Sequence, residues 1–220
     1  MELPMDFKSN KCTIIGSCNG LVCLTDDDYG FSGRVIYVFN PLLQKFKCII
    51  GSSYCCNRLN HEYTRVHVGF WYDDTKSDYK LIRIMHFRKG GLLSYDKEQS
   101  LVEVYSLNTR SWRKINYAKV SGIIECSYQH VFVDGTLNGL AGYSRKSEVM
   151  IEFILSFDCR SYVFREVELP SYQEHHLCPL VPNLEVYKGC LALFVALGCD
   201  EDRTAIWSLW LMKEFGVAET

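Results

Sequence analysis

The chain has 220 residues, of which 48% are hydrophobic and 23% are charged, so its composition is that of a folded globular protein and excludes wholesale disorder. Its 24 Lys and Arg residues nearly balance 26 Asp and Glu residues, and the net charge of -2 excludes a general polyanion-binding protein. No apolar run approaches the roughly 18 residues that a membrane helix needs. Residues 1–6 have neither the basic nor the apolar region of a secretory signal.

The chain contains 11 cysteines, an odd number, and it has no Asn-x-Ser/Thr glycosylation site. Without a secretory signal, the expected compartment is a reducing one, in which thiols stay free. We therefore predict a cytoplasmic protein whose cysteines act as small buried hydrophobic residues rather than as a disulfide framework.

Residues 1–11 are polar and irregular, and we expect them to form a lead-in linker. From residue 12 onward, short runs rich in β-branched and aromatic residues alternate with clusters of Gly, Asn, Asp and Ser, which is the pattern of strands and turns. Such runs occur at 34–39, 79–84, 101–107, 150–157 and 191–197. No long stretch has the i, i+3, i+4, i+7 apolar spacing of a helix, so the sequence predicts an all-β chain.

Two short sequence units recur along the chain. The first unit, GSCNGL at 16–21, is echoed by GTLNGL at 135–140 and by VYKGCL at 186–191. In these copies Gly20, Gly139 and Gly189 follow Asn or Lys between apolar runs, which predicts hairpin turns with positive φ. The second unit is a polar turn with a cation, followed by an aromatic residue, and it occurs at 40–46, 108–112 and 158–162.

The two units alternate with a period of about fifty residues, and four strands per period is typical of a propeller blade. We predict an antiparallel β-propeller with blades at 12–50, 64–115, 130–169 and 183–216, the last without its outermost strand. An intervening unit fills the gap between the first and later repeats, and its first hairpin is expected at 68–84, with the turn at 73–78. An antiparallel β-sandwich is the alternative fold, because short, evenly spaced strands fit it as well.

The aromatic residues of the second unit have a predicted structural role. We expect Trp112 and Tyr162 to pack between blades. Arg110 and Arg160 precede them in the same turns and are expected to lie over the rings or to pair with a neighbouring carboxylate.

The opening unit, GSCNGLVC at 16–23, together with Asn40-Pro41 resembles the start of the plant F-box-associated domain. Three later segments match that domain in the same order, namely GFWYD at 69–73 with DYKL at 78–81, VYSL at 104–107 with WR at 112–113, and IW at 206–207 with MKEFGV at 212–217. The resemblance covers residues 12–220. Within this kelch-like family, the chain is most similar to the S-locus and S-haplotype-specific F-box proteins of pollen self-incompatibility.

The resemblance implies a substrate receptor of an SCF-type E3 ubiquitin ligase. In such a receptor, an F-box binds a Skp1-like adaptor and, through it, a cullin, while the β-rich domain captures the protein to be ubiquitinated. For the S-locus members, this target is the basic S-RNase of the pistil. Because no F-box helices precede residue 12, we interpret the chain as a fragment that lacks the F-box and is truncated on its C-terminal side.

Motifs for catalysis and for cofactor binding are absent from the sequence. No phosphate-binding or nucleophile-elbow motif occurs, and no cofactor is predicted. His175, His176 and Cys178 could be zinc ligands, but no second ligand pair stands at a matching spacing. Hence the sequence predicts no metal site.

The alternative function is a propeller enzyme such as a glycosidase, which needs two carboxylates in the central channel. Most acidic residues lie in predicted loops, and Glu103 and Glu152 have the parity of outward-facing strand residues. The sequence therefore favours a protein-binding domain over an enzyme, with no nucleic-acid partner and no membrane partner.

In a propeller blade, the first and third connections share one edge, and the second and fourth share the other. The first set is short in this sequence, whereas the second set is mostly long, at 25–33, 51–63, 87–99, 116–128, 144–148, 170–182 and 198–204. Long loops on a rigid scaffold usually carry recognition. These loops have a total charge of about −4 and are rich in tyrosine, a typical interface anchor.

We therefore predict that the long loops bind a basic, S-RNase-like protein. In this interpretation the acidic residues steer the partner and the tyrosines anchor it. The residues expected to contact the partner are Asp26, Asp27, Asp28, Tyr29, Tyr54, Tyr95, Asp200, Glu201 and Asp202.

Overall fold

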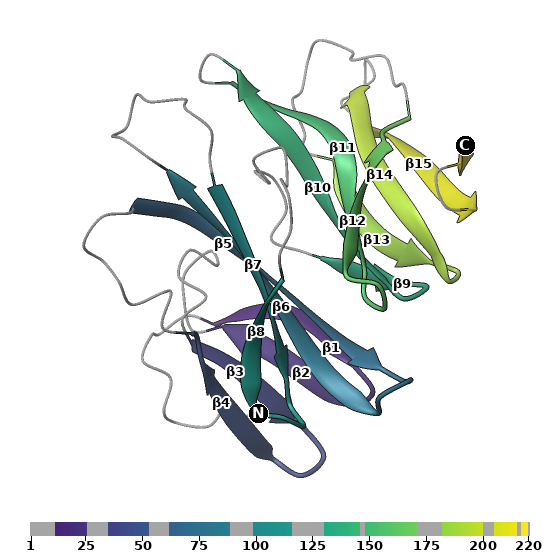
Figure 1. Cartoon of the computed structure of the whole chain (residues 1–220). Helices are drawn as coiled ribbons and strands as arrows, with labels where there is room; N and C mark the ends of the chain where they lie inside the picture. The colour runs from purple at the N-terminus through teal and green to yellow at the C-terminus, as the bar shows by residue number, and fades with distance from the viewer. Residues whose placement is uncertain are drawn as a thin grey trace. The chain divides into compact units, whose positions relative to one another are not determined.

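The computed structural model describes residues 12–25, 35–52, 62–88, 99–115, 130–145, 148–170, 182–199, 205–214 and 217–219. Within these ranges the regular secondary structure consists of β-strands, and each strand pair is antiparallel. The chain divides into two compact units, Met1–Ser121 and Gly122–Thr220. Each unit contains two four-stranded sheets (Figure 1). The all-β prediction is confirmed.

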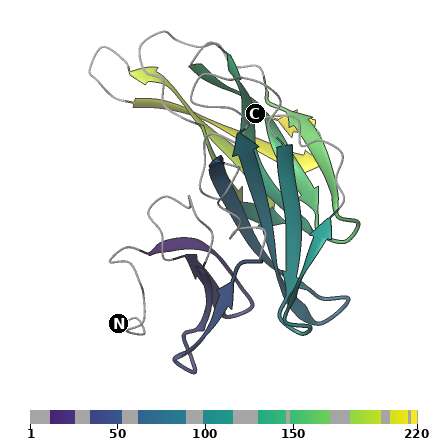
Figure 2. The ribbon, with the colours of Figure 1, turned by 60° about the vertical axis from the view of Figure 1, so that its left-hand side comes forward.

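In the first unit, both sheets are meanders whose neighbouring strands follow one another along the chain. The first sheet contains β1 (Thr13–Cys18), β2 (Leu21–Thr25), β3 (Val35–Asn40) and β4 (Lys45–Ile50). The second sheet contains β5 (Glu62–Asp73), β6 (Asp78–Arg88), β7 (Gln99–Ser106) and β8 (Ser111–Ile115), and its strands run side by side as blue and teal arrows in Figure 2. The predicted hairpin at 68–84, with its turn at 73–78, is therefore confirmed.

The second unit repeats the same plan in its two sheets. The third sheet contains β9 (Val131–Val133), β10 (Thr136–Arg145), β11 (Glu148–Asp158) and β12 (Val163–Glu168). The fourth sheet contains β13 (Asn183–Tyr187), β14 (Cys190–Cys199), β15 (Ala205–Glu214) and β16 (Val217–Glu219). All four sheets lie within three residues of the predicted blade boundaries, and the meander of consecutive strands is that of propeller blades.

The prediction that the last blade lacks its outermost strand is wrong. Strand β16 pairs with β15, with Glu219 opposite Leu211 and Ala218 opposite Met212. A register shift between Met212 and Glu214 precedes this pairing. The strand was missed because three residues are too few to show the alternation by which a strand is recognised in a sequence.

The prediction of a turn is also wrong for one of the three glycines. Gly20 and Gly189 have φ values of 78° and 79°, as expected for tight hairpins. The corresponding glycine of the third sheet is Gly135, with φ 74°, whereas Gly139 lies inside β10 opposite Leu155. Gly139 instead permits a close approach, because a Cβ at this position would lie 3.1 Å from the His130 ring.

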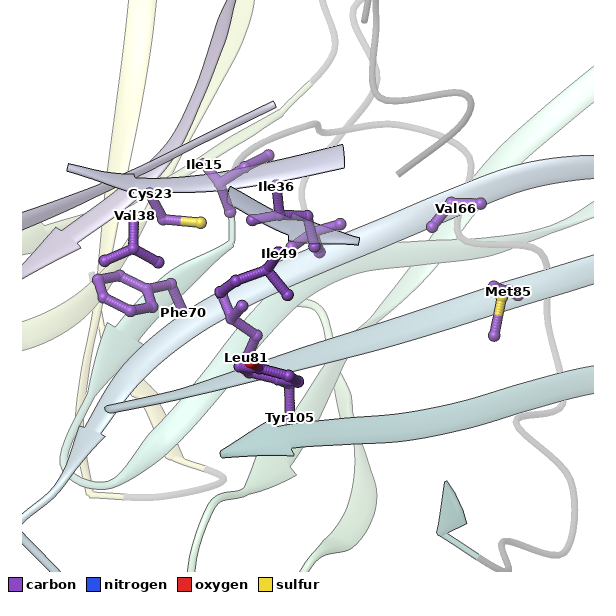
Figure 3. Close-up of a cluster of buried hydrophobic side chains, with 11 residues drawn as sticks. Ile15, Cys23, Ile36, Val38, Ile49, Val66, Phe70, Leu81, Met85 and Tyr105 are labelled. Carbon is purple, nitrogen blue, oxygen red and sulfur yellow. The ribbon is translucent and has the colours of Figure 1, made fainter. Parts of the chain in front are cut away.

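Each unit has a hydrophobic core between its two sheets. In the first unit, Ile36 and Ile49 of the first sheet gather with Phe70, Leu81 and Tyr105 of the second sheet (Figure 3). In the second unit, the core joins the third and fourth sheets. Its buried residues are Val131, Leu140, Ile154, Val167, Leu184, Leu191, Leu193 and Val195.

Trp112 packs against the core of the first unit, as predicted. Its ring contacts Tyr105 at 5.1 Å between centroids, and its Nε1 donates a hydrogen bond of 3.0 Å to the carbonyl oxygen of Ile50 in the first sheet. The Arg83 guanidinium lies over the ring, with its Cζ 4.7 Å from the centroid. That Arg110 lies over the ring or pairs with a carboxylate stays a prediction. Tyr162 stacks on Phe157 of its own sheet, with 5.9 Å between the ring centroids, and its packing between blades stays a prediction.

Glu103 is buried, which corrects its predicted outward parity. It lies on β7 opposite Arg83 on β6, and the exposed fractions of the two residues are 1% and 0%. The Arg83 guanidinium forms an ion pair with the Glu103 carboxylate, and the Ser52 hydroxyl donates a hydrogen bond of 2.7 Å to the same carboxylate. Gly51 makes room for this cluster, because a Cβ there would overlap the guanidinium.

The parity argument failed because it assumed a strand with one face in solvent. On β7, Val102 and Val104 are buried together with Glu103, so both faces of the strand are covered. The side chain of Glu152 lies outside the described part of the structure, and its predicted parity stays a prediction.

Replacing Gly20 with alanine should lower the free energy of unfolding by about 1–2 kcal/mol, because the added Cβ is strained at positive φ. The added atom meets no neighbour within 4 Å, so no clash contributes. Gly16 in the same hairpin is the matched control, since it is equally open and its φ is not in the left-handed region. Gly16→Ala should change stability by less than about 1 kcal/mol. Equal losses for the two variants in urea unfolding would contradict this account of the hairpin.

Candidate binding site

The long loops that were predicted to bind a partner lie almost entirely outside the described residues. This holds for each of the nine predicted contact residues, Asp26, Asp27, Asp28, Tyr29, Tyr54, Tyr95, Asp200, Glu201 and Asp202. The possible zinc ligands at 175–178 lie outside the described residues as well. One loop is shorter than predicted, because Arg145 pairs with Glu148 and only residues 146–147 separate β10 from β11.

The opposite edge of the sheets lies within the described residues except at 215–216, and we call it the short-turn edge. It carries the hairpins that join the first strand to the second and the third strand to the fourth. Among the described residues, seven other than glycine have positive φ, and all of them lie in these hairpins. They are Asn19, Gln44, Ser77, Arg110, Asp134, Tyr162 and Lys188.

A pocket of about 210 Å³ opens at the short-turn edge of the second unit. The third sheet supplies most of its lining from all four strands, and β14 and β15 of the fourth sheet close one side. The lining residues are Val133, Asp134, Thr136, Asn138, Ser156, Asp158, Arg165, Leu191 and Met212. The strand register brings the polar members together, because Thr136 pairs with Asp158, and Ser156 pairs with both Asn138 and Arg165.

The two most buried polar residues of the pocket are Asn138 and Ser156, each with an exposed fraction of 1%. The Asn138 amide nitrogen donates hydrogen bonds to the carbonyl oxygens of Val131 and Thr136, both at 3.3 Å. This fixes the orientation of the amide. Asn138 Oδ1 and Ser156 Oγ are buried and have no hydrogen-bond partner within the described protein. Buried polar atoms are normally paired, so these two atoms mark the pocket as unusual.

Charged groups surround the pocket near its opening. Asp158 accepts hydrogen bonds of 2.9 Å from the backbone N–H groups of Ser161 and Arg160. These hydrogen bonds, led by that from Ser161 and helped by the charge of Arg165, hold the pKa of Asp158 below its usual range. Asp158 is therefore ionised at neutral pH. With Asp134, two carboxylates and one guanidinium line the pocket.

Two of the described cysteines, Cys18 and Cys23, are poorly suited to catalysis. Burial raises the pKa of the Cys18 thiol to about 12, and burial also raises the pKa of Cys23. Both thiols are therefore protonated at neutral pH, whereas a nucleophilic cysteine needs its thiolate. In the described part of the chain, no three metal-ligating side chains come together at a metal-binding distance.

The described residues also contain no helix with the length and hydropathy to cross a membrane.

The polar lining of this pocket follows a pattern that is visible in the sequence. Thr136 and Asn138 alternate with apolar residues on β10, and Ser156 and Asp158 do so on β11. Polar residues at a period of two along buried strands share one face of the sheet. The prediction of a turn at 135–139 hid this alternation, because the turn in fact ends at Gly135.

Comparison with known proteins places this fold in a family. Four meander sheets, with a small polar pocket at a hairpin edge of the third sheet, define the class of an all-β domain. The chain belongs to the family of the F-box associated beta propeller domain, which it matches over residues 2–219. The fold class is therefore the antiparallel β-propeller, as predicted, and the sandwich alternative is wrong.

Curated relatives come from Arabidopsis thaliana. The chain is 26% identical to F-box protein CPR1 over 235 residues, covering 100% of this chain and 53% of the relative. It is 27% identical to F-box/kelch-repeat protein At3g23880, covering 92% of this chain and 49% of the relative. The chain is also 26% identical to F-box protein At3g07870, covering 94% of this chain and 49% of the relative. The chain thus spans about half the length of the curated relatives it matches.

Proposed function

We propose that the chain is the substrate-recognition domain of an SCF-type E3 ubiquitin ligase. The observation that carries this proposal is the match to the F-box associated domain over residues 2–219. The relatives are named as F-box proteins and are about twice as long as the matched segment. In a receptor of this kind, a separate F-box recruits a Skp1-like adaptor and a cullin, and the propeller holds the target. Such a ligase works inside the cell, so the proposed location is the cytoplasm.

The described side chains support binding rather than catalysis. Glu103 is a buried acid on a strand, but its carboxylate is taken up by Arg83 and Ser52. A general acid or nucleophile needs a carboxylate that can reach a substrate. The pocket of the second unit, by contrast, offers buried polar atoms without partners, which is what a recognition site requires.

We further propose that the target is a basic protein, and that a pistil S-RNase in pollen self-incompatibility is the first candidate to test. Two observations support this choice, namely the resemblance of the sequence to S-locus receptors and the charge of about −4 on the long loops. Asp26, Asp27 and Asp28 form one acidic cluster, and residues 200–202 form another. In this proposal Tyr29, Tyr54 and Tyr95 are the anchors, and truncating a true anchor costs about 2 kcal/mol of binding free energy.

Replacing Asp26, Asp27 and Asp28 together with serine should slow association with the ribonuclease several-fold at low salt and much less at physiological salt. Charges at the rim of an interface act mainly on the encounter rate, and the Debye length falls from about 30 Å at 0.01 M to about 8 Å at 0.15 M salt. Surface plasmon resonance measures the association rate at each of the two ionic strengths.

The matched control removes the same number of charges from exposed strand positions, by replacing Glu166, Glu168 and Glu185 with glutamine. This control should associate faster than the triple Asp→Ser variant at low salt. The triple Asp→Ser variant could instead associate as fast as the unaltered chain at both salt concentrations. This result would show that the acidic cluster at 26–28 does not take part in binding.

A further inference from the structure

The pocket of the second unit has a chemistry that specifies its ligand. One of its buried polar atoms, Asn138 Oδ1, can only accept hydrogen bonds, and the amide nitrogen beside it is held by the carbonyl oxygens of Val131 and Thr136. Ser156 Oγ beside it can accept as well as donate. Both atoms are buried and lack a partner within the described protein. A ligand that fits must therefore bring a hydrogen-bond donor to the floor of the pocket.

The size and the walls of the pocket restrict the ligand further. Whole small molecules and cofactors usually occupy pockets of about 300–1,000 Å³, whereas this pocket measures about 210 Å³. Val133, Leu191 and Met212 form an apolar wall. The fitting group is therefore small, with an aliphatic stem and a donor at its tip.

The remaining lining residues indicate the sign of the charge that the ligand should carry. Two carboxylates and one guanidinium, from Asp134, Asp158 and Arg165, give the lining a net charge of −1. The lining as a whole therefore carries one negative charge in excess, which favours a cation. An acidic ligand would meet these carboxylates and the Asn138 acceptor, and an apolar ligand would leave both floor atoms unpaired.

We propose that this pocket receives a single basic side chain, a lysine or an arginine, presented by the protein target. The ammonium or guanidinium group donates to Asn138 Oδ1 and Ser156 Oγ, the stem packs on Leu191 and Met212, and the excess carboxylate favours the cation. The pocket lies at the short-turn edge and thus forms a second recognition element, apart from the long loops. The identity of the partner rests on the proposed receptor function, but the chemistry of the pocket does not.

The chemistry is tested on the full chain with small probes. The chain has 5 methionines, and their methyl groups can be labelled with carbon-13, with the Met212 signal assigned from a Met212→Leu variant. Titration with n-butylammonium should shift the Met212 signal saturably, and n-butylguanidinium should act in the same way. Butyrate, of similar length and opposite charge, should leave the signal unchanged. A shift with butyrate, or none with either cation, would overturn the proposal.

Two variants show whether the cation binds at the floor of the pocket. Ser156→Ala removes one floor acceptor and should weaken n-butylammonium binding about fivefold, which is the effect of one hydrogen bond. Thr25→Val is the matched control, because Thr25 Oγ1 is also buried without a partner but belongs to the first unit. Thr25→Val should leave the affinity unchanged, and Asp134→Asn, at an exposed position, should weaken it without disturbing the fold. Unchanged affinity in both Ser156→Ala and Asp134→Asn would overturn the proposal.

A last comparison separates this inference from the proposed function. If the ribonuclease binds the unaltered chain, Ser156→Ala should raise its dissociation rate, and Thr25→Val should not. A ribonuclease that binds both variants equally well would overturn the role of the pocket in target recognition. A ribonuclease that does not bind the unaltered chain would overturn the proposed target, while the probe titration would still decide the chemistry of the pocket.

Discussion

Replacing Arg83 with methionine is expected to lower the free energy of unfolding of the first unit by about 3–5 kcal/mol. Arg83 and Glu103 form an ion pair in which both side chains are excluded from solvent. Removing the guanidinium leaves the Glu103 carboxylate buried without its cation, next to the Ser52 hydroxyl. It also removes the cation that lies over the Trp112 ring. Urea unfolding followed by tryptophan fluorescence measures the loss.

Two further variants isolate the cause of this loss. The double variant Arg83→Met, Glu103→Leu should recover most of the stability, because burying apolar groups of similar volume in place of an ion pair is often neutral. Arg113→Met, at an exposed position on β8, should change stability by less than about 0.5 kcal/mol. A loss for Arg83→Met no larger than that for Arg113→Met would show that the buried pair does not stabilise the first unit.

Replacing Leu140 with alanine is expected to destabilise the second unit by about 2–5 kcal/mol. Leu140 is fully buried and belongs to the core that joins the third and fourth sheets, with Ile154 and Leu184 among its members. Truncation loses the burial of the side chain and leaves a cavity between two rigid sheets that close it poorly. Thermal or urea unfolding monitored by circular dichroism measures the loss.

The control for this prediction is Val186→Ala in the same unit. Val186 is 48% exposed on β13, so its truncation should cost less than about 1 kcal/mol. If both variants lost the same stability, the third and fourth sheets would not share the core described above.

The blades could be predicted from the sequence because their hairpins are local. Gly20 and Gly189 follow residues that also have positive φ, and each pair directly separates two antiparallel strands. In the third blade the same reasoning chose Gly139 over Gly135, because the LNGL segment resembles the CNGL segment of the first blade. Local sequence similarity could not show that Asn138 belongs to a strand, which is decided by its pairing with Val131.

The buried polar residues could not be predicted, since their environment comes from strands that are distant in the sequence. Glu103 meets Ser52, which is 51 residues away, and no periodicity in β7 alone reports this contact. The pocket depends in the same way on Ser156 of the third sheet and Met212 of the fourth. By contrast, the family could be recognised from the sequence, because its motifs are short, local and spread along nearly the whole chain.

The receptor role itself is tested most directly by a reconstituted ubiquitination reaction. The chain is joined to the F-box of a relative and combined with the Skp1-like adaptor, a cullin, the ubiquitin-conjugating components and either a pistil S-RNase or an acidic protein of similar size. The account predicts polyubiquitin chains on the ribonuclease and none on the acidic protein, and it predicts that the F-box segment alone modifies neither. If the joined chain ubiquitinated the ribonuclease no more than the F-box segment alone does, the proposed receptor role would be contradicted.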